Sequence, residues 1–195
     1  KTYEANTNAI ESIITLSNLA GGETLSHSGT ASTSSANAGS YTINNLSGIS
    51  ISNGTGTASN YTLTGGTHSF IIAERAISVN GTRLYDATRN AEASDLSTQT
   101  NLVGSQTLVL SGTGIIASRD VGSNKTVSVG TLTLADGSNG GLAANYTLSG
   151  GTHQLTVTQR PLNSSGSKAY DANTDALANA ITLSNLAGGE TLVHS

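Results

Sequence analysis

The chain has 195 residues, and Ser (28), Thr (28), Gly (23) and Asn (18) together make up half of it. Eight basic and twelve acidic residues give a net charge of −4 without a basic cluster, which argues against nucleic-acid binding. The sequence contains no run of about 20 apolar residues and no cysteine, which argues against membrane insertion, disulfide bonds and thiolate chemistry.

The low hydrophobic content of 35% does not by itself indicate disorder. Disordered chains are typically rich in charge, whereas this polarity comes from Ser, Thr and Asn. Threonine favours β-strands, so these residues can cover the solvent-facing side of a sheet. The arrangement of the apolar residues therefore decides the fold class.

Internal repetition is the strongest pattern in the sequence. Lys1–Ser28 and Lys168–Ser195 are identical at 20 of 28 aligned positions. Tyr3, Tyr85 and Tyr170 mark the same position in successive copies, with spacings of 82 and 85 residues. We therefore predict a repeat of this length.

The repeat limits follow from the motifs that open and close each copy. Residues 1–75 form a repeat without its first strand, residues 76–160 form a complete repeat, and residues 161–195 form the N-terminal part of a further repeat. We expect residues 161–195 to dock on the second repeat or to borrow strands from another molecule.

Alternation of apolar residues with Ser or Thr predicts half-buried strands along the chain. It occurs at Tyr41–Ile43, Ile49–Ile51, Val127–Val129, Leu132–Leu134 and Leu155–Val157. Turn-forming dipeptides separate the strands, at Asn53–Gly54, Gly65–Gly66, Asn80–Gly81, Asp136–Gly137, Asn139–Gly140 and Gly150–Gly151.

The segment Thr174–Ile181 fits either a short helix or a strand. Short strands with frequent turns predict an all-β fold, with tandem immunoglobulin-like β-sandwich repeats in an extended rod. The alternative is a β-grasp-like repeat with one short helix. The junctions near Arg75 and Arg160 contain no Gly/Ser linker, so we expect neighbouring repeats to be held semi-rigidly.

Five of the six tyrosines recur at fixed repeat positions, which makes them structural markers: Tyr3, Tyr85 and Tyr170 at one position, Tyr61 and Tyr146 at another. We predict that their rings are buried and that their hydroxyls bond to the backbone. Tyr41 has no counterpart. It is the candidate for an exposed ring that stacks on sugars.

Residues able to carry catalysis or bind a metal are sparse. The four histidines fall at two repeated positions, His27 with His194 and His68 with His153, without the convergent ligands that zinc needs. We predict that the chain is not an enzyme and has no catalytic or metal site. Asp136–Gly140 resembles part of a calcium loop but fits a plain turn. No cofactor is expected, and calcium between repeats is kept as an alternative.

The order of the motifs resembles the YDG/MBG-type repeats of bacterial filamentous-haemagglutinin-like adhesins. The resemblance is carried by Lys168–Thr174, Arg83–Thr88, Ala20–Leu25, Val121–Val127, Ala38–Ile43, Ala144–Leu148, Ser59–Leu63, and the closing Arg75–Ile77 and Arg160–Leu162. The chain departs from that pattern at Glu4, which replaces Asp, and in having Ala where the family often has Gly.

The resemblance implies a large secreted or surface-anchored protein, often exported by two-partner secretion, with repeats that act as stalk or spacer modules. It implies an extracellular location and a role in cell adhesion or biofilm-matrix formation. The expected partners are neighbouring repeats of the same chain, with polysaccharide or a host or bacterial surface as further candidates. The alternative is a carbohydrate- or matrix-binding module that uses exposed Tyr and Asn on a sheet face.

Overall fold

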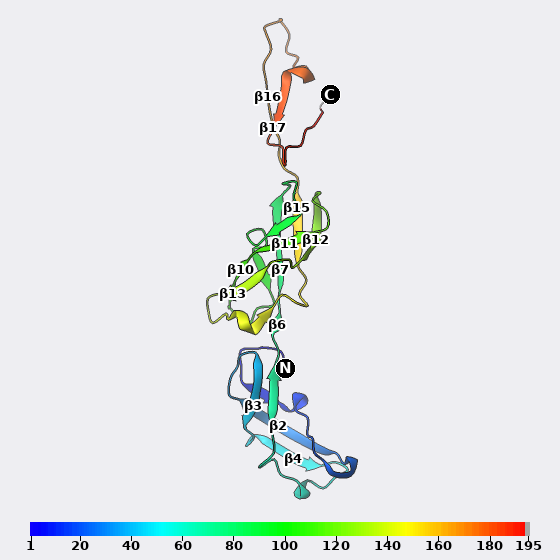
Figure 1. The fold of residues 1–195 in the computed structure, drawn as a ribbon, viewed down its shortest axis with the longest axis vertical. Helices are drawn as coiled ribbons and strands as arrows, with labels where there is room; N and C mark the ends of the chain where they lie inside the picture. Colours follow the sequence, from blue (N-terminus) through cyan, green and yellow to red (C-terminus); the bar gives the residue numbers. More distant parts are fainter. Residues whose placement is uncertain (194–195) are drawn as a thin grey trace. The chain divides into compact units, whose positions relative to one another are not determined.

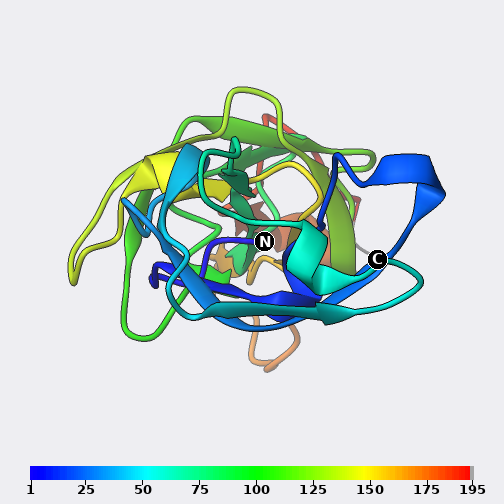
Figure 2. The ribbon, with the colours of Figure 1, turned by 90° about the horizontal axis from the view of Figure 1, so that it is seen from below.

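Short β-strands and single 3-10 turns make up residues 1–193, the part of the chain that the computed structural model describes (Figures 1 and 2). No α-helix occurs within these residues. The all-β prediction is therefore confirmed. None of the described segments is a helix that could span a membrane.

The described chain separates into two compact units. The first comprises Lys1–Ile77, Asn101–Val109 and Leu134–Gly150, and the second comprises Ser78–Thr100, Leu110–Thr133 and Gly151–Ser195. Each unit takes segments from two successive sequence repeats, so contacts between repeats lie inside a unit. The repeat limits inferred from the sequence stay a prediction.

An antiparallel five-stranded sheet organises the first unit. Its members are β1 (Asn8–Ile10), β2 (Leu25–Thr33), β3 (Gly39–Asn45), β4 (Ile49–Asn53) and β5 (Ser69–Ile72). The order is β1-β2-β3-β5, and β4 pairs with the N-terminal half of β2. The long β2 has three partners, because β1 pairs with its residues 30–32, β3 with residues 32–33 and β4 with residues 25–29.

A short parallel pair completes the first unit. β6 (Arg75–Ala76) lies beside β14 (Tyr146–Thr147), which follows the 3-10 turn η4 (Ala143–Asn145). The buried core of this unit consists mainly of aliphatic and aromatic side chains: Tyr3, Ala9, Ala31, Ile43, Phe70, Ile72, Ile77, Leu108, Tyr146 and Leu148.

A six-stranded sheet organises the second unit, in the order β8-β11-β12-β15-β7-β9. The strands are β7 (Ser78–Leu84), β8 (Asn90–Glu92), β9 (Thr98–Thr100), β11 (Thr113–Ile116), β12 (Gly122–Ser128) and β15 (Gln154–Thr158). β7 and β15 run parallel, so the opening and closing strands of the second repeat lie side by side (Figure 1).

Two further two-stranded sheets occur. β10 (Leu108–Ser111) pairs with β13 (Thr133–Asp136), and β16 (Asn163–Gly166) pairs antiparallel with β17 (Ile181–Ser184). The segment Thr174–Ile181 forms neither a full helix nor a strand: residues 174–177 are irregular, the 3-10 turn η5 (Ala178–Ala180) follows, and only Ile181 belongs to β17.

One predicted turn is wrong. Asn80–Gly81 lies inside β7 rather than between strands. The glycine serves close approach, because a Cβ atom at Gly81 would lie 1.6 Å from the carbonyl oxygen of Asp95. Packing at this point leaves no room for a side chain, so the glycine is required inside the strand. The Asn80–Gly81 dipeptide therefore looks like a turn signal in the sequence although it forms no turn.

Candidate functional site at the repeat junctions

A loop near the start of each repeat begins with a basic residue whose side chain holds the loop closed. In every copy this side chain forms an ion pair with the acidic residue three positions later and bonds to the residue five positions later. The sets are Lys1 with Glu4 and Asn6, Arg83 with Asp86 and Thr88, and Lys168 with Asp171 and Asn173. The loops thus share one conformation.

The alanine in each of these loops has a left-handed backbone. The φ angles are 58° at Ala5, 64° at Ala87 and 59° at Ala172. Glycine adopts this region without steric cost, whereas alanine does not. The Ala-for-Gly departure noted in the sequence therefore places strain at the same point of all three loops.

The tyrosine of the first loop reaches into the second repeat. The Tyr3 ring is 3% exposed and packs edge-on against Tyr146, with centroids 5.3 Å apart at 78°. Gln106 lies between the two hydroxyls: its Nε2 donates to the Tyr3 oxygen at 3.1 Å, and its Oε1 accepts from the Tyr146 hydroxyl at 2.5 Å. One amide thus joins residues from both repeats.

A tyrosine contact at the corresponding repeat positions occurs at the second junction, between residues 76–160 and 161–195. The Tyr85 hydroxyl donates to Glu190 Oε1 at 2.5 Å, and Arg119 lies 3.4 Å from the same oxygen. The hydrogen bond to Glu190 raises the pKa of Tyr85 above its usual value. Glu190 occupies the repeat position of Gln106.

Within the first repeat, Glu23 occupies this position and accepts from the Tyr61 hydroxyl at 2.5 Å. The hydrogen bond to Glu23 likewise raises the pKa of Tyr61. The backbone N–H of Ala20 donates to the Tyr61 oxygen, as that of Val103 donates to Tyr146. The side chain at the Glu/Gln position is therefore a hydrogen-bond partner of a tyrosine hydroxyl in every copy.

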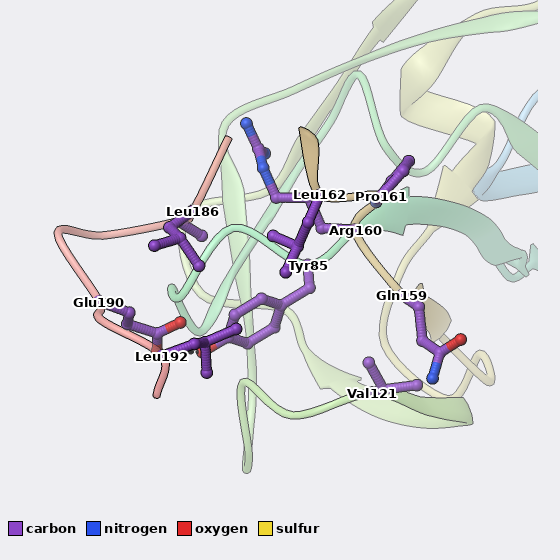
Figure 3. A pocket seen from close by; sticks show the side chains of 10 residues that line it. Tyr85, Val121, Gln159, Arg160, Pro161, Leu162, Leu186, Glu190 and Leu192 are labelled. Atoms are coloured by element: carbon purple, nitrogen blue, oxygen red, sulfur yellow. Dashed lines mark hydrogen bonds between the residues drawn. The ribbon is translucent and has the colours of Figure 1, made fainter. Parts of the chain in front are cut away.

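A cavity of about 530 Å³ lies beside Tyr85 in the second unit (Figure 3). At the first junction the ring of Tyr3 packs against Tyr146. Figure 3 shows the Tyr85 ring beside Glu190 and Leu192, with Leu162 and Leu186 nearby. The cavity is therefore part of the second junction. Its apolar lining suits an aromatic ring.

An arginine–asparagine pair forms a second contact that recurs at both junctions. Arg75 donates from Nε to the Asn101 carbonyl at 2.8 Å and from Nη2 to Asn101 Oδ1 at 2.8 Å. Arg160 makes the same two bonds to Asn185, at 2.7 and 2.8 Å.

Each asparagine also donates its side-chain N–H back to the residue after the arginine, at 2.6 Å to Ala76 and 2.7 Å to Pro161. The φ angles of 69° at Asn101 and 65° at Asn185 present the carbonyl and the side chain together. Asparagine tolerates this left-handed region better than most residues.

Asn145 adds a further contact at the first junction. It is 1% exposed, its Oδ1 accepts from the backbone N–H of Ala38 at 2.8 Å, and its Nδ2 donates to Asn37 Oδ1 at 3.1 Å. The amide satisfies polar groups of the preceding repeat that would otherwise be costly to bury.

The structure places the predicted tyrosine markers as follows. Tyr3 and Tyr146 are buried and Tyr61 and Tyr85 are half-buried, and all four hydroxyls bond to Gln or Glu side chains. Backbone N–H groups donate to the hydroxyls of Tyr61 and Tyr146 only, among these four. Tyr170 differs, because its side chain is 94% exposed. The expectation of a buried ring therefore does not describe Tyr170 in this structure.

Tyr41 lies on β3 and is half-buried, with its hydroxyl donating to the Ala38 carbonyl at 3.2 Å. Sugar binding by Tyr41 stays a prediction. His27 and His68 are half-buried, His153 is 5% exposed, and His194 lies outside the described residues. Among residues 1–193, no three His or acidic side chains gather as metal ligands would.

The sequence alone did not identify the side chains that bond to the tyrosine hydroxyls and to the arginines. Glu23 and Glu190 occupy one repeat position in the sequence, but nothing local links them or Gln106 to the tyrosines. The available signal was that the position keeps a hydrogen-bonding side chain of one length in every copy. Asn101 and Asn185 carried a similar signal, since each precedes a leucine at the same repeat position.

Comparison with known proteins agrees with the repeat organisation. The family model for the YDG domain matches residues 1–68 and 73–154. No curated protein and no solved structure matches the chain. Because the matched residues cover most of the sequence, the chain belongs to the YDG domain family.

Proposed function

We propose that this chain is a structural spacer: a piece of the stalk of a large secreted or surface-anchored bacterial adhesin, without catalytic activity of its own. The observation that carries the proposal is the duplication of the junction. Arg75 with Asn101 and Arg160 with Asn185 form the same pair of hydrogen bonds at successive junctions. An extended array needs the same contacts between each repeat and the next, because these contacts fix how neighbouring repeats are placed.

The chemistry of the chain supports the same proposal. Charged residues make up 10% of the sequence, and its polar half consists of uncharged Ser, Thr, Gly and Asn. Such surfaces stay hydrated without strong electrostatic attraction to other molecules. The proposal includes an extracellular location and a role in cell adhesion or biofilm-matrix formation. It also includes contact with polysaccharide or cell surfaces by other parts of a larger protein.

Small-angle scattering on arrays of two, four and six complete repeats tests the spacer function. We expect the largest dimension to grow in proportion to the number of repeats. A matched array with the Arg75- and Asn101-type positions both changed to Ala should lose that proportionality. A largest dimension that grows with the square root of the repeat number in the unchanged array would reject the spacer proposal, because that is flexible-chain behaviour.

A further inference from the structure

Two of the three loops that begin with a basic residue hold a lysine amine against an asparagine side chain. Lys1 Nζ lies 2.5 Å from Oδ1 of Asn6. Lys168 Nζ lies 2.6 Å from Oδ1 of Asn173. In both loops the same amine also donates to the backbone carbonyl oxygen of that asparagine, at 3.0 and 2.9 Å respectively. Two hydrogen bonds therefore position each lysine amine on one asparagine.

A carboxylate connects the amine and the amide in each of these loops. Asp171 accepts from Lys168 Nζ on Oδ1 at 2.9 Å and from Asn173 Nδ2 on Oδ2 at 2.9 Å. Oε2 of Glu4 lies 3.7 Å from the amine of its own loop and accepts from the amide nitrogen at 3.4 Å. The hydrogen bond from Lys168 lowers the pKa of Asp171, so this carboxyl is ionised and can take up a proton.

A backbone N–H group points at the same amide oxygen in both loops. The N–H of Asn8 donates to Oδ1 of Asn6 at 3.1 Å, and the N–H of Asp175 donates to Oδ1 of Asn173 at 3.0 Å. A donor fixed on a carbonyl oxygen stabilises the negative charge that this oxygen gains when a nucleophile attacks the carbonyl carbon. Each loop therefore combines a nucleophile, a carbonyl group, a proton acceptor and an oxyanion donor.

We propose that Lys1 with Asn6, and Lys168 with Asn173, form an intramolecular isopeptide bond within their loop. The lysine Nζ forms a bond to Cγ of the asparagine, the bond between Cγ and Nδ2 breaks, and Nδ2 leaves as ammonia. A C=O bond is about 1.2 Å long, so each Nζ lies within about 4 Å of the Cγ that it attacks, close to the separation of about 3–3.5 Å from which such atoms react.

The carboxylate balances the protons of this step. Asp171 takes a proton from the Lys168 ammonium group, which frees the electron pair that attacks Cγ of Asn173. In sum, two protons pass from Nζ to the leaving nitrogen, which departs as ammonium, and the carboxylate is regenerated. Glu4 has the same role in the first loop. The step consumes no oxidant, reductant or other co-reactant.

Burial supports the reaction in the first loop. The side chain of Lys1 is 7% exposed, and burial favours the neutral form of an amine, which is the form that attacks. Arg83, at the same position of the complete repeat, is buried to the same degree, with 6% of its side chain exposed. Lys168 is 33% exposed and relies instead on its shorter contacts with the carboxylate.

The loop of the second repeat shows that the fold sets this geometry without the bond. Arg83 and Thr88 stand where the other two loops have lysine and asparagine, so this loop has neither a nucleophilic amine nor an amide. Its Ala87 nevertheless has a φ of 64°, close to the values of 58° at Ala5 and 59° at Ala172. The loop conformation therefore precedes the reaction, and the chain contains its own unreactive copy.

The bond would keep the loop closed under tension, because a covalent link replaces hydrogen bonds. The tyrosine and arginine–asparagine contacts of the junctions remain, since other side chains make them. Each loop reacts once with itself, which is compatible with a spacer that has no activity toward other molecules. The spacer function does not depend on the bond, and scattering from arrays tests it separately.

Mass spectrometry of the folded chain tests the proposal. We expect the intact mass to fall below the mass of the sequence by two ammonia molecules. Trypsin should no longer cleave after Lys1 or Lys168, because their amines have become amides. It should still cleave after Lys125, whose amine donates to the backbone carbonyl of Ser118 at 3.3 Å. Tandem spectra should show each modified lysine joined to the asparagine of its loop.

Matched variants distinguish this bond from a cyclic imide, which an asparagine forms without lysine and which also releases ammonia. Lys168→Arg keeps the charge, and arginine already occupies this position in the second repeat, so we expect a folded chain that loses one ammonia fewer. Asp171→Asn keeps the amine and the amide and should form the bond at least about 100-fold more slowly, because general acid–base catalysis contributes at least that factor.

Transfer of the reactive pair to the second repeat is the converse test. Arg83→Lys combined with Thr88→Asn places the pair beside Asp86, and we expect the loss of one further ammonia. Arg83→Lys alone should show no further loss. An intact mass of the original chain equal to that of its sequence would overturn the proposal. So would a loss of ammonia that persists when Lys1 and Lys168 are both changed to Arg.

Discussion

The hydroxyl of Tyr85 lies 2.5 Å from the carboxylate of Glu190, although 105 residues separate the two in sequence. Tyr3 and Gln106, 103 residues apart, form the equivalent contact one repeat earlier. Each repeat therefore presents a tyrosine to the Glu/Gln position of the next one. This tyrosine contact adds to the arginine–asparagine contact at each junction.

The Tyr85–Glu190 bond predicts a loss of stability at alkaline pH. The hydrogen bond to Glu190 raises the pKa of Tyr85 above 10.0 in the folded chain. A raised folded-state pKa means that the stabilisation is complete below the unfolded value and is lost as pH rises through the folded value. We expect the free energy of unfolding to fall above pH 10, and to fall less in Tyr85→Phe.

Chemical denaturation across this pH range measures the effect. Tyr170→Phe is the matched control, because it also removes one hydroxyl but from a ring that is 94% exposed. The two phenylalanine variants should differ in the alkaline part of the profile. Identical profiles would show that Glu190 does not stabilise protonated Tyr85.

Replacing the left-handed alanine by glycine should stabilise the chain. Ala87 has a φ of 64°, where an L side chain costs roughly 1–2 kcal/mol, and glycine gives back about 0.5–1 kcal/mol through unfolded-state entropy. We expect Ala87→Gly to raise the free energy of unfolding by about 0.5–1 kcal/mol. Ala144→Gly in η4 is the control and should destabilise. A loss of stability in Ala87→Gly would contradict the strain argument.

The amide of Gln106 should tolerate Glu but not Met. Met leaves the buried Tyr3 hydroxyl without its partner, which costs about 1–3 kcal/mol. Gln106→Glu keeps two acceptor oxygens, as Glu23 and Glu190 do in the other copies, so we expect a change below about 1 kcal/mol at pH 7. Thermal or denaturant unfolding ranks the variants. Equal stability of the Met and Glu variants would show that packing alone matters here.

The side chain of Asn101 can be tested apart from its backbone conformation. Asn101→Gly keeps the left-handed φ accessible but removes the bonds to Arg75 and to the Ala76 carbonyl. We expect a loss of about 1–3 kcal/mol, since each of the two hydrogen bonds contributes about 0.5–1.5 kcal/mol. Asn101→Ala should lose more, because it adds backbone strain. If the glycine variant matches the original chain, the side-chain bonds contribute nothing measurable.

The sequence by itself determined the repeat, the all-β class and several strand positions. The predicted strands include Tyr41–Ile43, Ile49–Ile51 and Leu155–Val157, and all three lie in strands. Alternation of apolar and polar residues is a local property, and in a strand it places the apolar side chains on one face of the sheet and the polar ones on the other. The fixed tyrosines were likewise visible in the sequence, since repetition alone marks them.

The tertiary structure decided which of these pieces meet. The parallel pairing of β7 with β15, the position of Asn80–Gly81 inside a strand and the contacts of the Tyr3 and Tyr85 hydroxyls all depend on partners about 70 residues or more away, or on close backbone approach. Local periodicity states which face of a strand is buried but not which strand lies beside it. That choice comes from packing and from satisfying buried polar groups, which exist only once the chain is folded.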